Sequence, residues 1–187
     1  MPSREEDLLD AAIGVLGSQG VRALTHRAVD AAAAVPTGST ANYFKTRDML
    51  ISAVVDRFAD RDRATWQAIA GFVRPTTAVE LAAALAAYVH RALGPDRALT
   101  IARYGLFVEA AVRPKLQARL AEAADSIRMW GTEWLRVIGS TDPEGECAAI
   151  LDYLEGLIFH QLTFPGPVDQ LEAAITQTVG RLCTTAA

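Results

Sequence analysis

The chain has 187 residues, of which 51% are hydrophobic and 21% charged, and its formal net charge is −4. This length allows one or two domains with a sizeable core. Two cysteines are too few for a disulfide framework, and no apolar run approaches the roughly 20 residues that a membrane span needs. We also expect no signal peptide, because the acidic start of the chain lacks an apolar segment. The composition indicates an alanine-rich, helical, cytoplasmic protein without a membrane partner.

The first part of the chain predicts three short helices. Apolar residues recur at helical spacing over 4–19, and Gly20 follows as the stop. Thr25 is the expected N-cap of a second helix, which ends where Pro36 forces a turn. A third helix is expected over 37–42. The second and third helices then form a helix-turn-helix that the first helix braces.

The helix-turn-helix segment carries a local excess of positive charge. Between residues 22 and 47, four Arg or Lys side chains accompany the single acid Asp30, which gives +3 within a chain of net charge −4. Small, hydrogen-bonding side chains on the third helix can enter a major groove and touch base edges. Judged from these residues alone, a solvated helical hairpin with incidental cations remains an equal alternative.

One set of residues follows a known family pattern without a gap. Its members are Leu8, Leu9, Asp10, Ala11, Ala12, Gly20, Thr25, Arg27, Val29, Ala31, Ala33, Val35, Gly38, Ser39, Tyr43, Phe44, Arg47 and Leu50. This pattern resembles the DNA-binding segment of the TetR family of bacterial one-component regulators. Three residues depart from it: Ala34 replaces a usual turn glycine, Thr37 a common lysine and Ala41 a common tyrosine.

The resemblance implies an all-α fold of about nine helices in two domains. Residues 1–47 would form a three-helix DNA-binding domain, and residues 48–187 a ligand-binding and dimerisation domain. Tyr43 and Lys45 would hold phosphates, while polar side chains of the third helix face bases. The predicted DNA-binding residues are Thr25, Arg27, Thr37, Gly38, Ser39, Asn42, Tyr43 and Lys45.

The second domain is predicted to be helical throughout. Thr46 can cap one long helix that continues to Phe72, and the charged run 60–63 within it is expected to face solvent. Further helices are expected over 77–93, over 96–112, and from about Pro114 to Ile138, before a terminal helical hairpin that turns at 163–167.

Aromatic side chains gather on the helices that surround a ligand cavity in the resembled family. Core packing is the alternative for each of them, but tyrosine and tryptophan also suit an organic ligand, because they add a polar atom to an apolar wall. Helical spacing puts most of the nearby charges (Arg103, Glu109, Arg128 and Glu133) opposite the aromatic positions. We therefore expect a largely apolar, ring-containing or acyl effector, neutral or singly charged. The predicted ligand-binding residues are Trp66, Tyr88, Tyr104, Phe107, Trp130, Trp134 and His160.

The terminal hairpin carries more apolar surface than one partner helix covers. A second stripe, formed by Ala149, Tyr153, Gly156 and His160, widens the face of its first helix. This breadth favours self-association as a four-helix bundle, although burial within one chain is the alternative. The predicted dimer-interface residues are Leu154, Leu157, Ile158, Leu171, Ile175 and Val179.

No motif supports catalysis. The three histidines are isolated from one another, and no phosphate loop, nucleophile elbow or metal-ligand spacing occurs. We therefore expect neither enzyme activity nor a metal or cofactor. The expected function is that of a homodimeric repressor that a small ligand releases from operator DNA. The alternative is an all-helical small-molecule binding protein without operator function, which the departures at Ala34 and Ala41 favour.

The two cysteines, Cys147 and Cys183, lie at nearly equal distances on either side of the hairpin turn. An antiparallel hairpin would bring them to one level, where a disulfide needs Cα atoms within about 7 Å. Two inert thiols in a reducing cell are the alternative.

Overall fold

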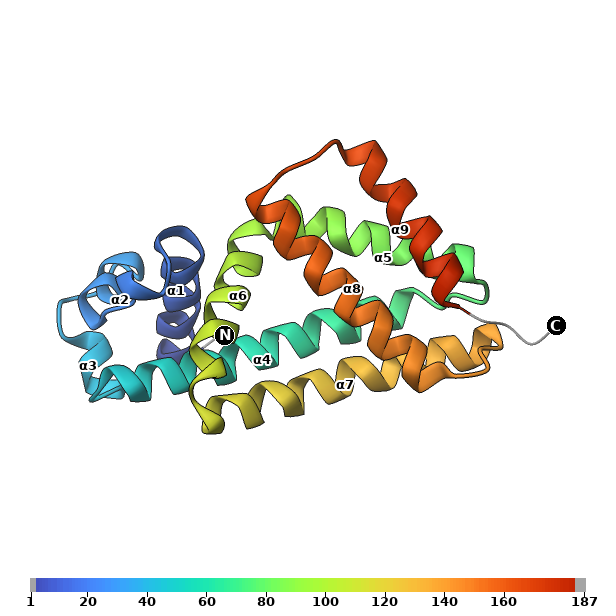
Figure 1. Cartoon of the computed structure of the whole chain (residues 1–187). Coiled ribbons are helices and arrows are strands. Elements are labelled where there is room, and N and C mark those ends of the chain that lie inside the picture. Colours follow the sequence, from blue (N-terminus) through green and yellow to red (C-terminus); the bar gives the residue numbers. More distant parts are fainter. Residues whose placement is uncertain (1–2, 184–187) are drawn as a thin grey trace. The chain divides into compact units, whose positions relative to one another are not determined.

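The computed structural model describes residues 3–183, which fold into α-helices joined by short turns (Figure 1). The predicted all-α class is confirmed, and most helices begin and end within two residues of their predicted positions. Within the described residues, no helix combines the length and apolarity needed to cross a membrane. The elements are α1 (Arg4–Gln19), the 3-10 helix η1 (Val21–Ala23), α2 (His26–Ala32), α3 (Ser39–Tyr43), α4 (Arg47–Phe72), α5 (Ala78–Leu93), α6 (Arg97–Ala111), α7 (Pro114–Ile138), α8 (Pro143–Thr163) and α9 (Val168–Leu182).

The helices pack into two compact units. Unit 1 combines residues 3–64 with Asp96–Ala123, and unit 2 combines Thr65–Pro95 with residues 124–183. Both α4 and α7 therefore contribute one part to each unit. The first half of α4 belongs with the predicted DNA-binding helices because its buried side chains share one core with those of α1 and α2. This core includes Leu8, Leu16, Leu24, Val29, Leu50, Val54 and Phe58.

In unit 1, α1 and α6 approach each other backbone to backbone. Ser3 and Glu6 form a capping box at the start of α1, and the predicted apolar face of that helix is buried. A Cβ atom added at Gly17 would collide with the backbone carbonyl group of Ala98 at the start of α6. Glycine at position 17 is therefore what permits this close packing.

The charged run 60–63 does not simply face solvent, so that expectation is wrong. Arg61 pairs with Asp10 of α1 at 3.2 Å, and Asp62 lies 3.9 Å from Arg103 of α6. Consecutive helical residues point about 100° apart, so four of them face nearly all sides of the helix and some must face neighbouring helices. Arg57 also donates two hydrogen bonds to Asp10, at 2.8 and 2.9 Å, and these hold the pKa of Asp10 below its ordinary value.

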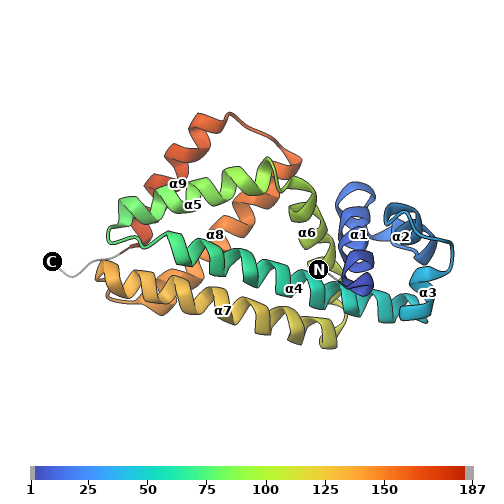
Figure 2. The same ribbon diagram turned by 180° about the vertical axis from the view of Figure 1, so that it is seen from behind.

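Unit 2 is built around α5, which packs against both α8 and α9 (Figure 2). Thr77 caps α5 by accepting a hydrogen bond from the backbone N–H of Glu80 at 3.2 Å. Apolar residues along α5 then recur at helical spacing and are buried, among them Leu81, Leu85 and Val89. One face of α5 therefore covers the terminal hairpin, and part of that face lines the chamber described below.

Candidate DNA-binding surface and ligand chamber

A buried carboxylate joins the two helices of the helix-turn-helix. Asp30 is 2% exposed and accepts hydrogen bonds from the backbone N–H of Gly38 (2.7 Å) and from the N–H and hydroxyl of Thr40 (2.7 and 2.6 Å). Burial alone would raise the pKa of Asp30, but the bonds from Thr40 and Gly38 outweigh it and lower that pKa. Sequence reasoning missed this role, because spacing alone does not separate a buried acid from a solvated one.

The turn between α2 and α3 uses two left-handed residues. Ala34 has φ 52° and Gly38 has φ 94°. The third helix therefore begins at Ser39 and not at Thr37, because a left-handed Gly38 cannot continue a right-handed helix backward. The hydroxyl of Ser39 donates to the Pro36 carbonyl at 2.6 Å, which further fixes the turn.

Most of the predicted DNA-binding side chains are exposed on unit 1. Thr25 is exposed, and its hydroxyl accepts from the Ala28 N–H at 3.2 Å, as an N-cap should. Gly38 and Ser39 are half-buried, and the Ser39 hydroxyl is already bonded within the turn. The other exposed members are Arg27, Thr37, Asn42, Tyr43 and Lys45.

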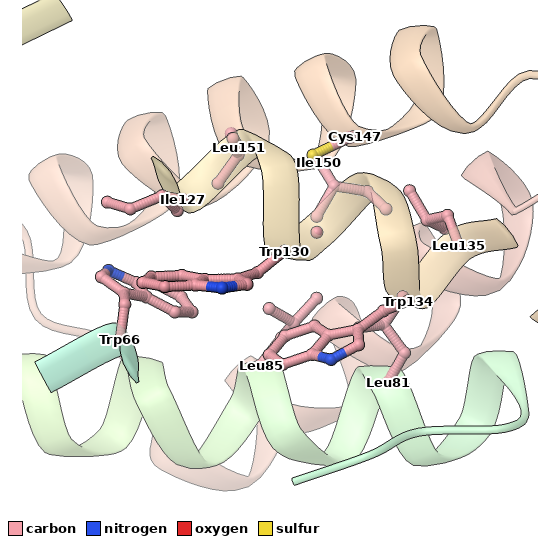
Figure 3. A pocket seen from close by; sticks show the side chains of 11 residues that line it. Trp66, Leu81, Leu85, Ile127, Trp130, Trp134, Leu135, Cys147, Ile150 and Leu151 are labelled. Atoms are coloured by element: carbon pink, nitrogen blue, oxygen red, sulfur yellow. The ribbon is translucent and has the colours of Figure 1, made fainter. Parts of the chain in front are cut away.

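Unit 2 contains a small apolar chamber in which about 30 Å³ is open to a water-sized sphere (Figure 3). Side chains from α4, α5, α7 and α8 line it, and none of them is charged. The indole N–H of Trp66 is buried and has no hydrogen-bond partner among the described residues, and its ring packs against Tyr88 with centroids 4.7 Å apart. The lining residues are Trp66, Leu81, Leu85, Ile127, Trp130, Gly131, Trp134, Leu135, Cys147, Ile150 and Leu151.

The chamber brings together three of the seven predicted ligand-binding residues, namely Trp66, Trp130 and Trp134. Tyr88 supports Trp66 and does not line the chamber. His160 is exposed, with its ring 5.1 Å from that of Phe164. The aliphatic lining was missed, since on α5 and α8 its spacing is the same as that of ordinary core residues.

The remaining two candidates, Tyr104 and Phe107, lie in unit 1 and contact each other edge to face, with ring centroids 5.9 Å apart. The guanidinium of Arg103 sits 5.4 Å from the centre of the Phe107 ring. Arg103 is thus an exception to the predicted separation of charges from aromatic positions. The reason is that residues four apart share one helix face.

Cys147 lies in the chamber wall against Gly131 of α7. A Cβ atom at Gly131 would stand 2.7 Å from the Cys147 sulfur, so this glycine provides the space that the thiol occupies. Both cysteines are free, and burial raises the pKa of each thiol. A raised pKa lowers the thiolate fraction, which favours the inert alternative over redox chemistry.

The terminal hairpin buries most of the side chains that were assigned to the dimer interface. Five of the six are between 0% and 6% exposed within a single chain, and they fill the interior of unit 2 against α5. Only Leu157 is half-buried. The five buried residues are Leu154, Ile158, Leu171, Ile175 and Val179. They therefore offer no surface to a second copy of the chain.

The second stripe of α8, in contrast, is exposed or only half-buried. Gly156 and His160 are exposed, and Ala149 and Tyr153 are half-buried. Phe159 beside them is 55% exposed. A Cβ atom at Gly156 would meet open space. The hairpin therefore does present an uncovered apolar face, but this face is the second stripe and not the set of predicted dimer-interface residues.

Residues 76–184 match the family model for the C-terminal domain of tetracycline-repressor-like proteins. A TetR-family protein from Streptomyces coelicolor A3 is 28% identical, with a TM-score of 0.70 over 98% of this chain and 100% of its own. The multidrug-binding protein EbrR, solved with proflavin, is 30% identical, with a TM-score of 0.65 over 96% of this chain and 99% of its own.

A TetR-like protein from Mesorhizobium loti is only 13% identical but has a TM-score of 0.79 over 97% of each chain, which shows the shared fold. No protein with a curated description matches. The family model covers more than half of the sequence, and the helices agree with TetR structures over nearly their full length. The chain belongs to the TetR family of transcriptional regulators, a family of non-enzymatic proteins.

Proposed function

We propose that the protein is a homodimeric repressor that binds operator DNA through α2 and α3 and releases it when a ring-containing organic molecule occupies the chamber. The chamber carries the proposal. It is apolar and it is walled by three indoles, and its present space of about 30 Å³ holds one or two water molecules, so a ligand enters it by moving side chains of the wall.

The DNA-binding half of the proposal rests on the exposed residues of unit 1. Lys45 and Tyr43 are available to phosphates, and Thr37 and Asn42 are available to base edges. Ser39 is less available to contact bases than we expected, because its hydroxyl donates a hydrogen bond to the Pro36 carbonyl. Asp30 fixes α3 relative to α2 and so sets the direction in which these side chains point.

The ligand half rests on the shape and chemistry of the chamber. EbrR has been solved with ethidium and with proflavin, which are flat, multi-ring molecules. Indole rings stack on flat aromatic surfaces, and the aliphatic side chains from α5 and α8 bury the remaining area. We assign the same general ligand class to this chain, with Trp66, Trp130 and Trp134 as the contacts.

The dimer is assigned to the uncovered stripe of α8 together with the outer face of α9. Gly156 on α8 and Gly180 on α9 are both exposed, and a Cβ atom at either would meet open space. Small residues at such positions let a second pair of helices approach closely. Tyr153 and Phe159 would supply the buried aromatic area of a four-helix bundle.

Release follows from a shift between two conformations of the dimer. A ligand can favour one conformation only if it binds that conformation more tightly than the other. The chamber provides this difference in affinity if it is open in one conformation and closed in the other. Trp66 lies on α4 and Trp130 on α7, and both helices also contribute to unit 1. We propose that α4 and α7 transmit the conformational change at the chamber to the DNA-binding helices.

The test of the DNA-binding role is a salt titration with DNA from the promoter region of the protein's own gene. Lys45→Ala should weaken binding to all sequences alike and lower the slope of log K against log salt by about one. Asn42→Ala should instead relax preference at one or two base pairs. Arg128→Ala, an equal charge change at an exposed position of α7 in unit 2, is the control and should leave the slope unchanged. If Lys45→Ala and Asn42→Ala both bind DNA like the parent, α3 is not the helix that contacts the DNA.

A further inference from the structure

A hydrogen bond from α2 reaches the residue that follows α3. The ring Nε2 of His26, the first residue of α2, lies 2.6 Å from the carbonyl oxygen of Phe44. A carbonyl oxygen can only accept a hydrogen bond, so Nε2 carries the hydrogen and donates it. His26 is half-buried and Phe44 is buried, which limits the competition of water for this bond.

The helix α2 therefore holds α3 at both of its ends. Asp30 accepts hydrogen bonds from the N–H groups of Gly38 and Thr40 at the start of α3, and His26 donates to the carbonyl group beyond its end. An acceptor at the start and a donor at the end match the groups that a helix leaves unsatisfied. The five residues of α3 are too few for a helix that is stable alone, so its position depends on these bonds.

The bond from His26 also orients the backbone of Lys45. The Phe44 carbonyl belongs to the same planar peptide group as the backbone nitrogen of Lys45, so fixing the one fixes the other. On the far side of Lys45, the guanidinium of Arg47 donates to the carbonyl oxygens of Val21 at 3.0 Å and Leu24 at 3.4 Å. The exposed Lys45 side chain thus extends from a short backbone segment that is held on both sides.

We propose that His26 is a positioning residue for operator binding, because its hydrogen bond to Phe44 places the Lys45 ammonium group where it meets a DNA phosphate. A contact that is oriented before binding costs less entropy when the complex forms. This inference rests on the proposed DNA-binding function. It adds a residue that acts through Lys45 and not by contacting the DNA itself.

The test is a double-mutant cycle between positions 26 and 45, measured by salt titration with DNA from the promoter region of the protein's own gene. His26→Leu removes the donor and keeps an apolar side chain, and it should weaken binding about two- to tenfold, as expected for one hydrogen bond. Lys45→Ala should lower the slope of log K against log salt by about one in the parent. In the His26→Leu background the same change should be less than about half as large, because the displaced lysine no longer meets its phosphate.

Two amide variants separate the hydrogen bond from a general loosening of the fold. The amide of glutamine reaches about as far as the histidine Nε2, whereas the amide of asparagine is one methylene closer to the backbone. His26→Gln should therefore bind DNA within about twofold of the parent and restore the full effect of Lys45→Ala, while His26→Asn should behave like His26→Leu. Equal DNA affinities for the two amide variants would overturn the proposal.

A matched control exists in unit 2. His90 of α5 is also a half-buried histidine, and the structure places it far along the chain from the helix-turn-helix. His90→Leu should leave both the affinity for DNA and the effect of Lys45→Ala unchanged.

The bond can also be observed in the parent protein, by nitrogen NMR of the histidine rings at mildly alkaline pH, where histidine rings are neutral. The signal of His26 is identified as the one that His26→Gln lacks. We expect its hydrogen on Nε2, and a hydrogen on Nδ1 would overturn the proposal.

The outcomes distinguish this inference from the proposed function. If Lys45→Ala weakens binding equally in the parent and in His26→Leu, His26 does not position Lys45, and the DNA-binding role of α3 stands. If Lys45→Ala binds like the parent while Asn42→Ala loses base preference, this inference fails and the proposed function again stands. If neither Lys45→Ala nor Asn42→Ala changes binding, both fail.

Discussion

One oxygen of the Asp30 carboxylate accepts two hydrogen bonds from a single residue, Thr40, from its backbone N–H at 2.7 Å and from its hydroxyl at 2.6 Å. The other oxygen accepts from the Gly38 N–H at 2.7 Å. Asp30 lies on α2 and Thr40 on α3, and both side chains are buried. The angle between the two helices of the helix-turn-helix therefore depends on an acid with no unpaired oxygen.

Asp30→Asn should destabilise the protein by about 2–3 kcal/mol, because its NH₂ group would face a backbone or hydroxyl donor in place of an acceptor. Urea denaturation measures this loss. Asp7→Asn, at an exposed position of α1, should stay within about 0.5 kcal/mol of the parent. Equal stabilities for the two variants would show that Asp30 does not join the helices.

The same carboxylate predicts a dependence on pH. The pKa of Asp30 is lowered in the folded state, so its stabilising effect is fully present above the unfolded value of about 3.9 and is lost as pH falls through the folded value. Asp10 and Glu6 also have lowered pKa values, so the comparison must be between parent and Asp30→Asn. The stability difference between them should shrink below about pH 4. A difference that is constant from neutral to acidic pH would contradict this role.

Ala34→Gly should stabilise the protein by roughly 0.5–1 kcal/mol. Alanine at φ 52° carries a steric cost of about 1–2 kcal/mol, which glycine removes. Glycine also adds entropy to the unfolded chain, and this offsets only part of the gain in stability. Ala31→Gly, at an exposed helical position of α2, should have the opposite sign and cost about 1 kcal/mol. Thermal unfolding of the two variants checks the signs, and a lower midpoint for Ala34→Gly would refute the strain.

Gly17→Ala and Gly14→Ala form a second matched pair, three residues apart on α1. A Cβ atom at position 17 collides with the Ala98 backbone, whereas one at position 14 meets open space. Gly17→Ala should destabilise by about 2 kcal/mol or more through overpacking, and Gly14→Ala should stabilise by about 0.5–1 kcal/mol. If denaturation ranks them in the reverse order, the close packing of α1 against α6 is wrong.

The helices of the fold could be predicted because their signals are local. Caps such as Thr25 and Thr77, the stop at Gly20 and the apolar spacing of α1 each lie within a few residues of the element that they define. The start of α3 was misplaced for the opposite reason. The backbone there follows from the left-handed Gly38 and from bonds to Asp30, which lies earlier in the chain.

The site was harder to predict than the fold. The three indoles of the chamber were identified because tryptophan is rare and chemically distinctive. Leu81 and Ile150 line the same space but follow the pattern of ordinary core residues. The hairpin misled in a similar way, since sequence shows that Ile175 and Val179 are apolar but not that α5 already covers them.

Gly156→Arg should convert the proposed dimer into a monomer. The position is exposed and has space for a side chain, so the monomer fold should survive, but two arginines would meet across a twofold axis. Ala83→Arg, on an exposed position of α5, is the control and should remain dimeric. Light scattering measures the mass. A dimeric mass for Gly156→Arg would remove the α8 stripe from the interface.

The coupling of chamber to DNA is tested most directly by fluorescence anisotropy of a labelled operator duplex during a ligand titration. We predict that proflavin releases the parent protein from DNA over the same concentrations that quench its tryptophan fluorescence. Trp130→Ala should bind the duplex as tightly as the parent but need at least about thirtyfold more ligand for release, which corresponds to a loss of about 2 kcal/mol. DNA that stays bound when quenching is complete, or a Trp130→Ala variant released at the parent's concentration, would contradict the account.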